Sequence, residues 1–298
     1  MMHKFNTPFD PGLQAISMPP TIRPLVAADL PVADRILQAA FERTHSFTPM
    51  LRLNGAAQPG NQCVAVIDGQ VVALVGAVDF GRFAYVALMG VDPAFHRRGI
   101  ARQMMDHVLA RLDAQGCPIV LLDATESGAG LYEQIGFVDD SFAYEYQGEA
   151  TMPTAPPSGP IELMTAAMMA EVAAFDATRF GADRNAVLRI LLAETPDRAL
   201  VCRDEQGSIA GYAFARIVLG PWVARDPATA EQLFDAVLRI NNSSAIHVLV
   251  PRSNEHAVEL LERRGVPRLR RLRHMRRGGD APPGDPSCLF GQVSFGLG

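Results

Sequence analysis

Residues 86–112 read VALMGVDPAFHRRGIARQMMDHVLARL, and residues 119–137 read IVLLDATESGAGLYEQIGF. The first stretch predicts a strand that stops at Asp92-Pro93 and then a helix, because apolar side chains recur every four positions from Ile100 to Leu112. The second stretch predicts another strand and a short helix. Strand, helix, strand and helix in this order favour an α/β architecture with parallel neighbouring strands and a ligand at their carboxyl ends.

The segment from His96 to Ala101 lies directly before the first predicted helix. The first N–H groups of a helix have no internal partners, and the helix dipole is positive at that end. Gly99 has no side chain, so phosphate oxygens can approach the backbone, and Arg97, Arg98 and Arg102 supply added positive charge. An ordinary strand-to-helix turn is the alternative, but the surrounding order of elements favours a diphosphate site.

These residues resemble the GNAT superfamily of acyl-CoA-dependent N-acyltransferases. The pyrophosphate loop of that family has the form Gln/Arg-x-x-Gly-x-Gly/Ala, which Gly99 and Ala101 match, while His96 stands where Gln or Arg is usual. A later helix of the family commonly ends in Leu-Tyr-Glu-x-x-Gly-Phe, as residues 131–137 do. The resemblance covers roughly residues 21–146 and implies acetyl-CoA, and thus coenzyme A, as the cofactor.

The resemblance also implies roles for single residues. Tyr132 would protonate the departing thiolate, since a phenol with a pKa of about 10 keeps its proton at neutral pH; packing against the cofactor is the alternative. A backbone N–H between Met89 and Val91 would stabilise the oxyanion. The general base stays open among Asp123, His45, Asp79 and a chain of water molecules. The residues assigned to the cofactor are Met89, Gly90, Val91, His96, Arg97, Arg98, Gly99, Ile100, Ala101, Arg102, Thr125 and Tyr132.

The second half repeats the first at a spacing of 129 residues, so that Ala230 follows Ala101 and Gly265 follows Gly136. Upstream the spacing is 139, which predicts two copies of one fold. We expect the second copy to have lost the chemistry. The relevant replacements are Gly99 by Ala228, Arg98 by Pro227, Tyr132 by Leu261 and Thr125 by Asn254, of which the last is the more usual residue of the family.

This arrangement resembles a GNAT subgroup in which a catalytic N-terminal domain precedes a degenerate GNAT-like C-terminal domain. We therefore predict an α/β (α+β) fold of two tandem GNAT-like domains, each a mixed, strongly twisted sheet flanked by helices. The expected boundaries are a leader at 1–20, a catalytic domain that binds acyl-CoA at 21–148, a proline-rich linker at 149–160 and the degenerate domain at 161–298, which shapes the acceptor site.

Phrases in the second half resemble that C-terminal domain, and they place candidate acceptor-binding residues between the two halves. These candidates are Asp176, Arg184 and Trp222, to which we add His45. An ion pair between Asp176 and Arg184 with a structural role, and a tryptophan in the core, are the alternatives.

Composition bounds the remaining possibilities. A chain of 298 residues with 48% hydrophobic composition predicts two domains, and no apolar run reaches the roughly 18 residues of a membrane span. We expect a cytoplasmic protein without a membrane partner. The four cysteines show no metal-like spacing, so we expect no metal. The net charge of −5 argues against nucleic acid, and the basic run Arg263–Arg277 predicts a solvated edge strand. Residues 288–295 predict a last strand.

The function expected from these observations is N-acetyl transfer from acetyl-CoA to the primary amine of a small molecule. Transfer would be direct, in a ternary complex, because no cysteine lies at the motif, and the protein would be a monomer or a homodimer. Two alternatives stay open. One is an acyl-CoA-binding sensor without catalysis, and the other is a protein or peptide N-acetyltransferase with an open groove.

Overall fold

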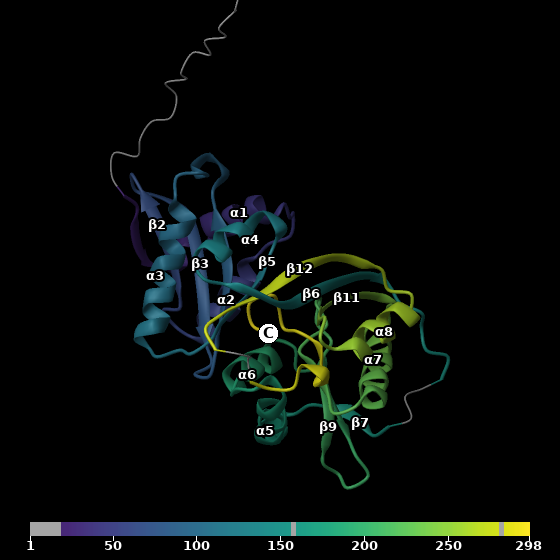
Figure 1. The fold of residues 1–298 in the computed structure, drawn as a ribbon. Helices are drawn as coiled ribbons and strands as arrows, with labels where there is room; N and C mark the ends of the chain where they lie inside the picture. Colours follow the sequence, from purple (N-terminus) through teal and green to yellow (C-terminus); the bar gives the residue numbers. More distant parts are fainter. Residues whose placement is uncertain (1–18, 156–158, 280–282) are drawn as a thin grey trace, which may run out of the picture.

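The computed structural model describes residues 19–155, 159–279 and 283–298 (Figure 1), so most of the leader expected at 1–20 and part of the expected linker lie outside the described residues. Within these described residues, the first half has six strands, with two α-helices after the first strand and two α-helices that flank the fifth. Its elements are β1 (Thr21–Pro24), η1 (Ala27–Asp29), α1 (Leu30–Phe41), α2 (Thr48–Ala57), β2 (Gln62–Ile67), β3 (Gln70–Asp79), β4 (Ala84–Val91), η2 (Pro93–Phe95), α3 (Ile100–Ala114), β5 (Val120–Ala124), α4 (Glu126–Gln134) and β6 (Val138–Glu149).

The second half repeats this order. Its elements are β7 (Ile161–Leu163), η3 (Ala166–Met168), α5 (Met169–Phe180), α6 (Asn185–Glu194), β8 (Ala199–Arg203), β9 (Ile209–Phe214), β10 (Trp222–Ala224), α7 (Pro227–Asn241), β11 (Ala245–Pro251), α8 (Glu255–Arg263), β12 (Arg268–Arg277), η4 (Pro286–Cys288) and β13 (Leu289–Gly291). Helix α8 begins 129 residues after α4, and α5 begins 139 residues after α1. Both spacings are those of the sequence repeat, and β13 adds a strand at the place expected from residues 288–295.

The two halves exchange the last strand of each repeat, which is β6 in the first half and β12 in the second. One sheet has the order β1-β2-β3-β4-β5-β12-β6-β11, so β12 of the second half lies between β5 and β6 of the first. Strand β6 in turn lies between β12 and β11, antiparallel to both. Figure 1 shows β6 and β12 running side by side at the centre of the molecule. A second sheet, β13-β10-β9-β8-β7, belongs to the second half alone.

The expectation that the basic run forms an edge strand is wrong, because β12 is hydrogen-bonded on both sides, to β5 and to β6. Its arginines are tolerated there because acidic side chains of the first half pair with them at hydrogen-bonding distance. The pairs are Arg270 with Glu145, Arg273 with Glu133 and Asp139, Arg276 with Asp140, and Arg277 with Asp113. The basic run is therefore a contact surface between the halves.

The faces of the first-half sheet are covered by different parts of the chain. Helices α3 and α4 pack on one face, where Val120, Leu122 and Ala124 of β5 join their core. Helices α1 and α2 pack on the opposite face. On that second face, Leu121 and Tyr85 form a cluster with Phe180 and Ala182 of the second half. In the described part of the chain, no helix is long and apolar enough to cross a bilayer.

Candidate active site

Strands β4 and β5 are parallel neighbours that diverge toward their carboxyl ends. They pair only at Ala84 with Val120 and at Tyr85 with Leu121. Beyond these pairs β4 continues to Val91 and β5 continues to Ala124, yet no further pairing joins them. The facing backbone groups of the two strand ends are thus left for a ligand, at the place where α/β sheets bind their ligands.

A β-bulge in β4 lies beside this divergence. Leu74 pairs with Gly90 and Gly76 pairs with Ala87, so two residues of β4, Leu88 and Met89, oppose the single residue between Leu74 and Gly76 on β3. Leu88 has a φ of 55°, in the left-handed region. Such a bulge disrupts the ladder locally and re-aims the backbone. It lies at the place expected for the oxyanion donor.

Gly90 has a packing reason of its own. A Cβ at this position would come to 3.2 Å from Cδ2 of Leu37 and 3.4 Å from Cβ of Ala40, both on α1. The missing side chain lets α1 approach β4 closely. The sequence alone attributed Gly90 only to the cofactor.

In the loop before α3, no side chain of the described residues covers Gly99, the residue directly before the helix. Gly99 is the N-cap of α3 with a φ of 75°, and no side chain caps the helix. A Cβ on Gly99 would meet nothing within 4 Å, so the space beside the first N–H groups is free in the described structure. An uncapped helix start with a left-handed glycine is suited to an anionic ligand.

The side chains of the loop are partly engaged with each other. The ring Nε2 of His96 lies 2.9 Å from the carbonyl oxygen of Val91, so His96 braces the loop against the end of β4. The guanidinium of Arg98 lies 4.9 Å from the centre of the Phe95 ring. Arg102 makes an exposed ion pair with Asp106 at 3.3 Å. These arginines stay exposed, and together with the uncapped helix they fit the diphosphate of coenzyme A.

Helix α4 brings Thr125 and Tyr132 to the other side of the divergence. The Thr125 side chain caps α4 by accepting a hydrogen bond from the N–H of Gly128 at 3.3 Å. The ring of Tyr132 packs edge-on against Phe137, with ring centres 5.9 Å apart. Burial raises the pKa of Tyr132 to about 12. Its phenol is therefore protonated throughout the neutral pH range and can act only as a donor of a proton there.

The three candidates for the general base occupy different environments. Asp123 is at the carboxyl end of β5, its side chain is 0% exposed, and Oδ1 lies 2.8 Å from Nδ1 of His274. Asp79 accepts a hydrogen bond from the N–H of Gly81 in the β3–β4 turn. His45 is exposed in the connection between α1 and α2, with its ring 4.9 Å from that of Phe47. Of the three, only Asp123 lies at the divergence of β4 and β5.

The candidate acceptor residues of the second half are buried. Arg184 makes a bidentate pair with Asp176, each nitrogen to oxygen distance being 2.8 Å, and Tyr212 donates its hydroxyl to Asp176 at 2.5 Å. Arg184 also donates to the backbone carbonyl of Gly298 at 2.9 Å. The pair of Asp176 and Arg184 therefore links α5, the start of α6 and the segment that follows β13.

Trp222 has a packing position, in contrast with the expectation that it faces the acceptor. Its side chain is 0% exposed and lies against Phe234 and Phe290, with ring centres 5.4 and 5.3 Å away. An acceptor could reach this ring only if the core opened. Trp222 is therefore a core residue of the second half.

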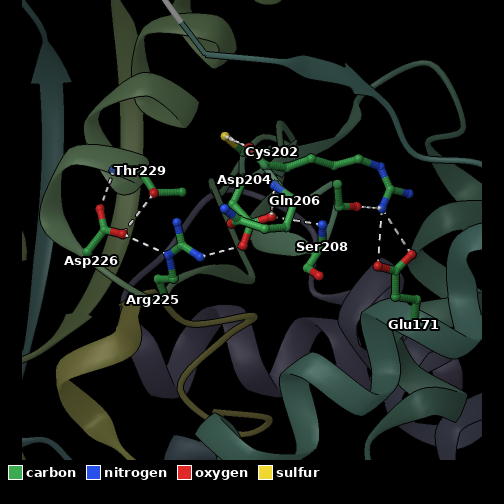
Figure 2. A network of polar contacts seen from close by, with 10 residues as sticks. Glu171, Cys202, Asp204, Gln206, Ser208, Arg225, Asp226 and Thr229 are labelled. Carbon is green, nitrogen blue, oxygen red and sulfur yellow. Dashed lines mark hydrogen bonds and ion pairs between the residues drawn. The ribbon is translucent and has the colours of Figure 1, made fainter.

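The loop that corresponds to the diphosphate loop in the second half is closed by its own side chains. Asp226 caps α7 and accepts from the N–H of Thr229 at 2.8 Å and from its hydroxyl at 3.1 Å. Arg225 bridges Asp226 and Asp204, as Figure 2 shows. The helix start that would receive a phosphate is thus occupied by a carboxylate, which would repel an anion.

Two groups at the strand exchange were not foreseen from the sequence. His274 of β12 was not singled out, although its position follows Glu145 by the repeat spacing of 129. Glu145 itself is buried in β6 and receives hydrogen bonds from Arg43, Arg270 and His247. Burial raises the pKa of Glu145, but the hydrogen bonds and charges of His247 and Arg270 outweigh burial and lower it to about 2. Only the exchange of strands brings these side chains together.

Comparison with known proteins agrees with this architecture. Two family models, each described as an acetyltransferase (GNAT) domain, match residues 58–139 and residues 172–291. The uncharacterized N-acetyltransferase YitH of Bacillus subtilis is 25% identical over 173 residues, which is 56% of this chain and 60% of YitH, so the match spans less than two thirds of that relative.

Solved structures share the fold over most of the chain. A protein from Pyrococcus horikoshii, provisionally assigned as an acetyltransferase, is 22% identical with a TM-score of 0.82, covering 100% of this chain and 99% of that one. A GCN5-related N-acetyltransferase from Sphaerobacter thermophilus is 16% identical with a TM-score of 0.69, covering 90% of this chain and 98% of that one. With GNAT domains matched in both halves, and with the repeated order of elements, this chain belongs to the GNAT acetyltransferase superfamily as a tandem of two GNAT domains.

Proposed function

We propose that this protein transfers an acetyl group from acetyl-CoA to the primary amine of a small molecule, directly and in a ternary complex, using the first-half site. The observation that carries the proposal is the coincidence at one place of three features. Strands β4 and β5 diverge, α3 begins without a cap at Gly99, and Tyr132 stands on the neighbouring helix. The second half has none of the three in this form.

The residues of the chain divide the work of binding and proton transfer. The N–H groups at the start of α3 and the exposed arginines Arg97 and Arg98 would hold the diphosphate of the donor. The β4 bulge at Leu88 and Met89 would direct a backbone N–H toward the oxygen on which negative charge develops. Tyr132 would give its proton to the sulfur as the thioester bond breaks.

The cover that the second half places over β4 and β5 supports a small acceptor. The segment after β13 packs against β4, so closely that a Cβ on Gly296 would fall 2.0 Å from Cβ of Ala87. Gly298 lies against the rings of Tyr85 and Phe180, which come from different halves. The second half therefore covers the face of β4 and β5 that an acceptor would approach. A protein substrate needs an open groove at this face, so the covered face favours a small amine.

The test is calorimetric binding of acetyl-CoA followed by thiol release against a panel of small amines and lysine-containing peptides. We expect the wild type to bind the donor and to release thiol with at least one small amine. In Tyr132→Phe we expect kcat to fall by about 100-fold or more, because a lost general acid costs roughly that factor, while donor affinity stays within twofold. Tyr144→Phe, which removes a phenol in the core of the other half, is the matched control.

Each contrary result has a meaning. Donor binding without thiol release on any amine would favour an acyl-CoA sensor, and turnover restricted to peptides would favour a protein acetyltransferase. Absence of donor binding by the wild type would refute the proposal.

A further inference from the structure

An imidazole from the second half lies at the first-half site because β12 crosses between the halves. We propose that His274 accepts the proton of the acceptor amine and that Asp123 is its positioning residue, an inference that rests on the proposed function. Asp123 was one of the candidate bases expected from the sequence, but its side chain is buried and engaged with the histidine. The exchange of strands thus assigns the base to a residue 151 positions away from Asp123 in the chain.

The face of the sheet on which Asp123 lies is the acceptor face. Val120, Leu122 and Ala124 of β5 point into the core beneath α3 and α4, so the alternate residues Leu121 and Asp123 point to the opposite side. Leu121 is the last residue of β5 that pairs with β4. Asp123 follows two residues later, about 7 Å farther along the diverging strand at the usual rise per residue. Its side chain therefore stands at the opening between the strands.

His274 is held against this carboxylate by the register of the sheet. It pairs directly with Asp123 across β5 and β12, and its Nδ1 lies 2.8 Å from Oδ1 of Asp123. A carboxylate only accepts, so Nδ1 carries the proton and Nε2 of the neutral ring presents its lone pair. Among the described residues no hydrogen-bond partner is found for Nε2, and the side chain keeps 14% of its surface exposed. The ring centre lies 6.1 Å from that of Tyr85, the last residue of β4 that pairs with β5.

The charged and titratable groups around the imidazole set its basicity. Asp123 faces the ring from β5, Asp140 from β6 and Tyr85 from β4. The charge of Arg184, from the second half, favours the ionised form of Tyr85. Burial opposes the charged ring, but the charge and hydrogen bond of Asp123, with Asp140 behind it, outweigh burial and raise the pKa of His274 above its usual 6.5. A base whose pKa lies near the working pH is suited to general base catalysis.

Acid and base then lie on opposite faces of the diverging strands. Tyr132 packs in the core on the α3 and α4 face, and His274 stands on the face covered by the second half. The acceptor, an ammonium ion in neutral solution, first gives a proton to Nε2 of His274, from which it passes to solvent. The freed nitrogen lone pair then forms the new C–N bond, and nitrogen releases its remaining extra proton to solvent. The C–S bond breaks with its electron pair on sulfur, which takes the phenolic proton of Tyr132, and the phenolate is reprotonated from solvent. Charge and protons balance without another reactant.

The experiment compares the pH dependence of kcat/KM for the wild type, His274→Gln and the matched control His247→Gln. His247 lies on β11, the last strand in the order of the same sheet, and it also bonds a carboxylate, Glu145, at 2.8 Å. In the wild type we expect kcat/KM to fall as the pH drops through the pKa of the His274 imidazole. In His274→Gln we expect kcat/KM to fall about 100-fold at neutral pH. The acidic limb of its pH profile, where kcat/KM falls with decreasing pH, should move to the pKa of the amine itself. His247→Gln should keep the wild-type limb.

A second measurement separates a base from a structural role. Acceptor amines of low pKa, which are already neutral in the assay, should lose less than tenfold in His274→Gln, whereas a merely distorted site would lose equally with every acceptor. Acetyl-CoA affinity and the thermal midpoint report whether the variant is folded. Asp123→Asn should shift the limb to lower pH by removing the charge that raises the pKa. An unchanged limb in His274→Gln would overturn this inference alone, whereas a wild type without turnover would overturn the proposed function with it.

Discussion

The first and second halves have the same order of elements, but they differ at the carboxyl ends of their central strands and at the helix starts that follow. In the first half α3 begins at Gly99 without a cap, and β4 and β5 part. In the second half Asp226 caps α7, and Arg225 holds that carboxylate in place (Figure 2). An acidic cap bonds the helix N–H groups that an anion would otherwise bind, and its charge repels the anion. A fold can therefore be retained after its ligand site is closed.

The closure extends to the strands. Strand β13 pairs with β10, and the next residue, Gln292, donates its backbone N–H to Leu249 of β11 at 2.8 Å. The Asn254 side chain donates to the carbonyl of Leu289 on β13 at 3.1 Å. Its first-half counterpart, Thr125, caps its own helix and lies 3.1 Å from the Ser127 hydroxyl, so both of these contacts stay within the α4 region. The place where the first half leaves strand edges for a ligand is thus filled in the second half by the chain itself.

The largest expected effect tests whether β13 is an integral part of the second-half core. Phe290 is 1% exposed and packs against Trp222. Phe290→Ala should lower the free energy of unfolding by about 3–5 kcal/mol, because it removes a large buried ring and leaves a cavity. Denaturant unfolding measures this. Leu269→Ala, at a side chain that is 49% exposed, is the control and should change stability by less than about 0.5 kcal/mol. A loss below about 1 kcal/mol for Phe290→Ala would mean that β13 does not fill the second half.

The next effect compares the two helix starts directly. Gly99→Glu should weaken acetyl-CoA binding by about 100-fold, roughly 2.7 kcal/mol, since it places a carboxylate and a strained left-handed residue where a phosphate would approach. Ala228→Glu makes the same change at the corresponding exposed position of α7 and should leave affinity within twofold. Titration calorimetry gives both values. Equal weakening by the two substitutions would break the assignment of the donor to the first half.

The smallest effect concerns the two residues at equivalent helix caps. Asn254→Ala removes the cap to the N–H of Ala257 and also the bond to Leu289, so it should cost about 2 kcal/mol of stability. Thr125→Ala removes a longer, partly exposed cap and an exposed bond to the Ser127 hydroxyl, and it should cost about 1 kcal/mol or less. Thermal unfolding of both variants gives the difference. If the order were reversed, Asn254 would not be a structural tie to β13.

Much of the local structure around the first-half candidate site was predictable because its signals are local. The glycine before α3, the period of that helix and the Leu-Tyr-Glu-x-x-Gly-Phe ending of the α4 region lie within about 50 residues. The repeat spacings of 129 and 139 likewise gave the tandem architecture. The acceptor residues were harder to predict, since burial decided between the readings: Trp222 is in the core, and Asp176 and Arg184 pair with each other.

By itself the sequence predicted the strand, helix, strand and helix order of residues 86–137 and its repetition in the second half, because side-chain periodicity acts over a few residues. Only the tertiary structure decided that β12 is a central strand rather than an edge, and that His274 meets Asp123. The physical reason is that an extended strand with alternating side chains can pair with any compatible edge. Which edge it joins depends on packing and charge complementarity between residues more than a hundred positions apart.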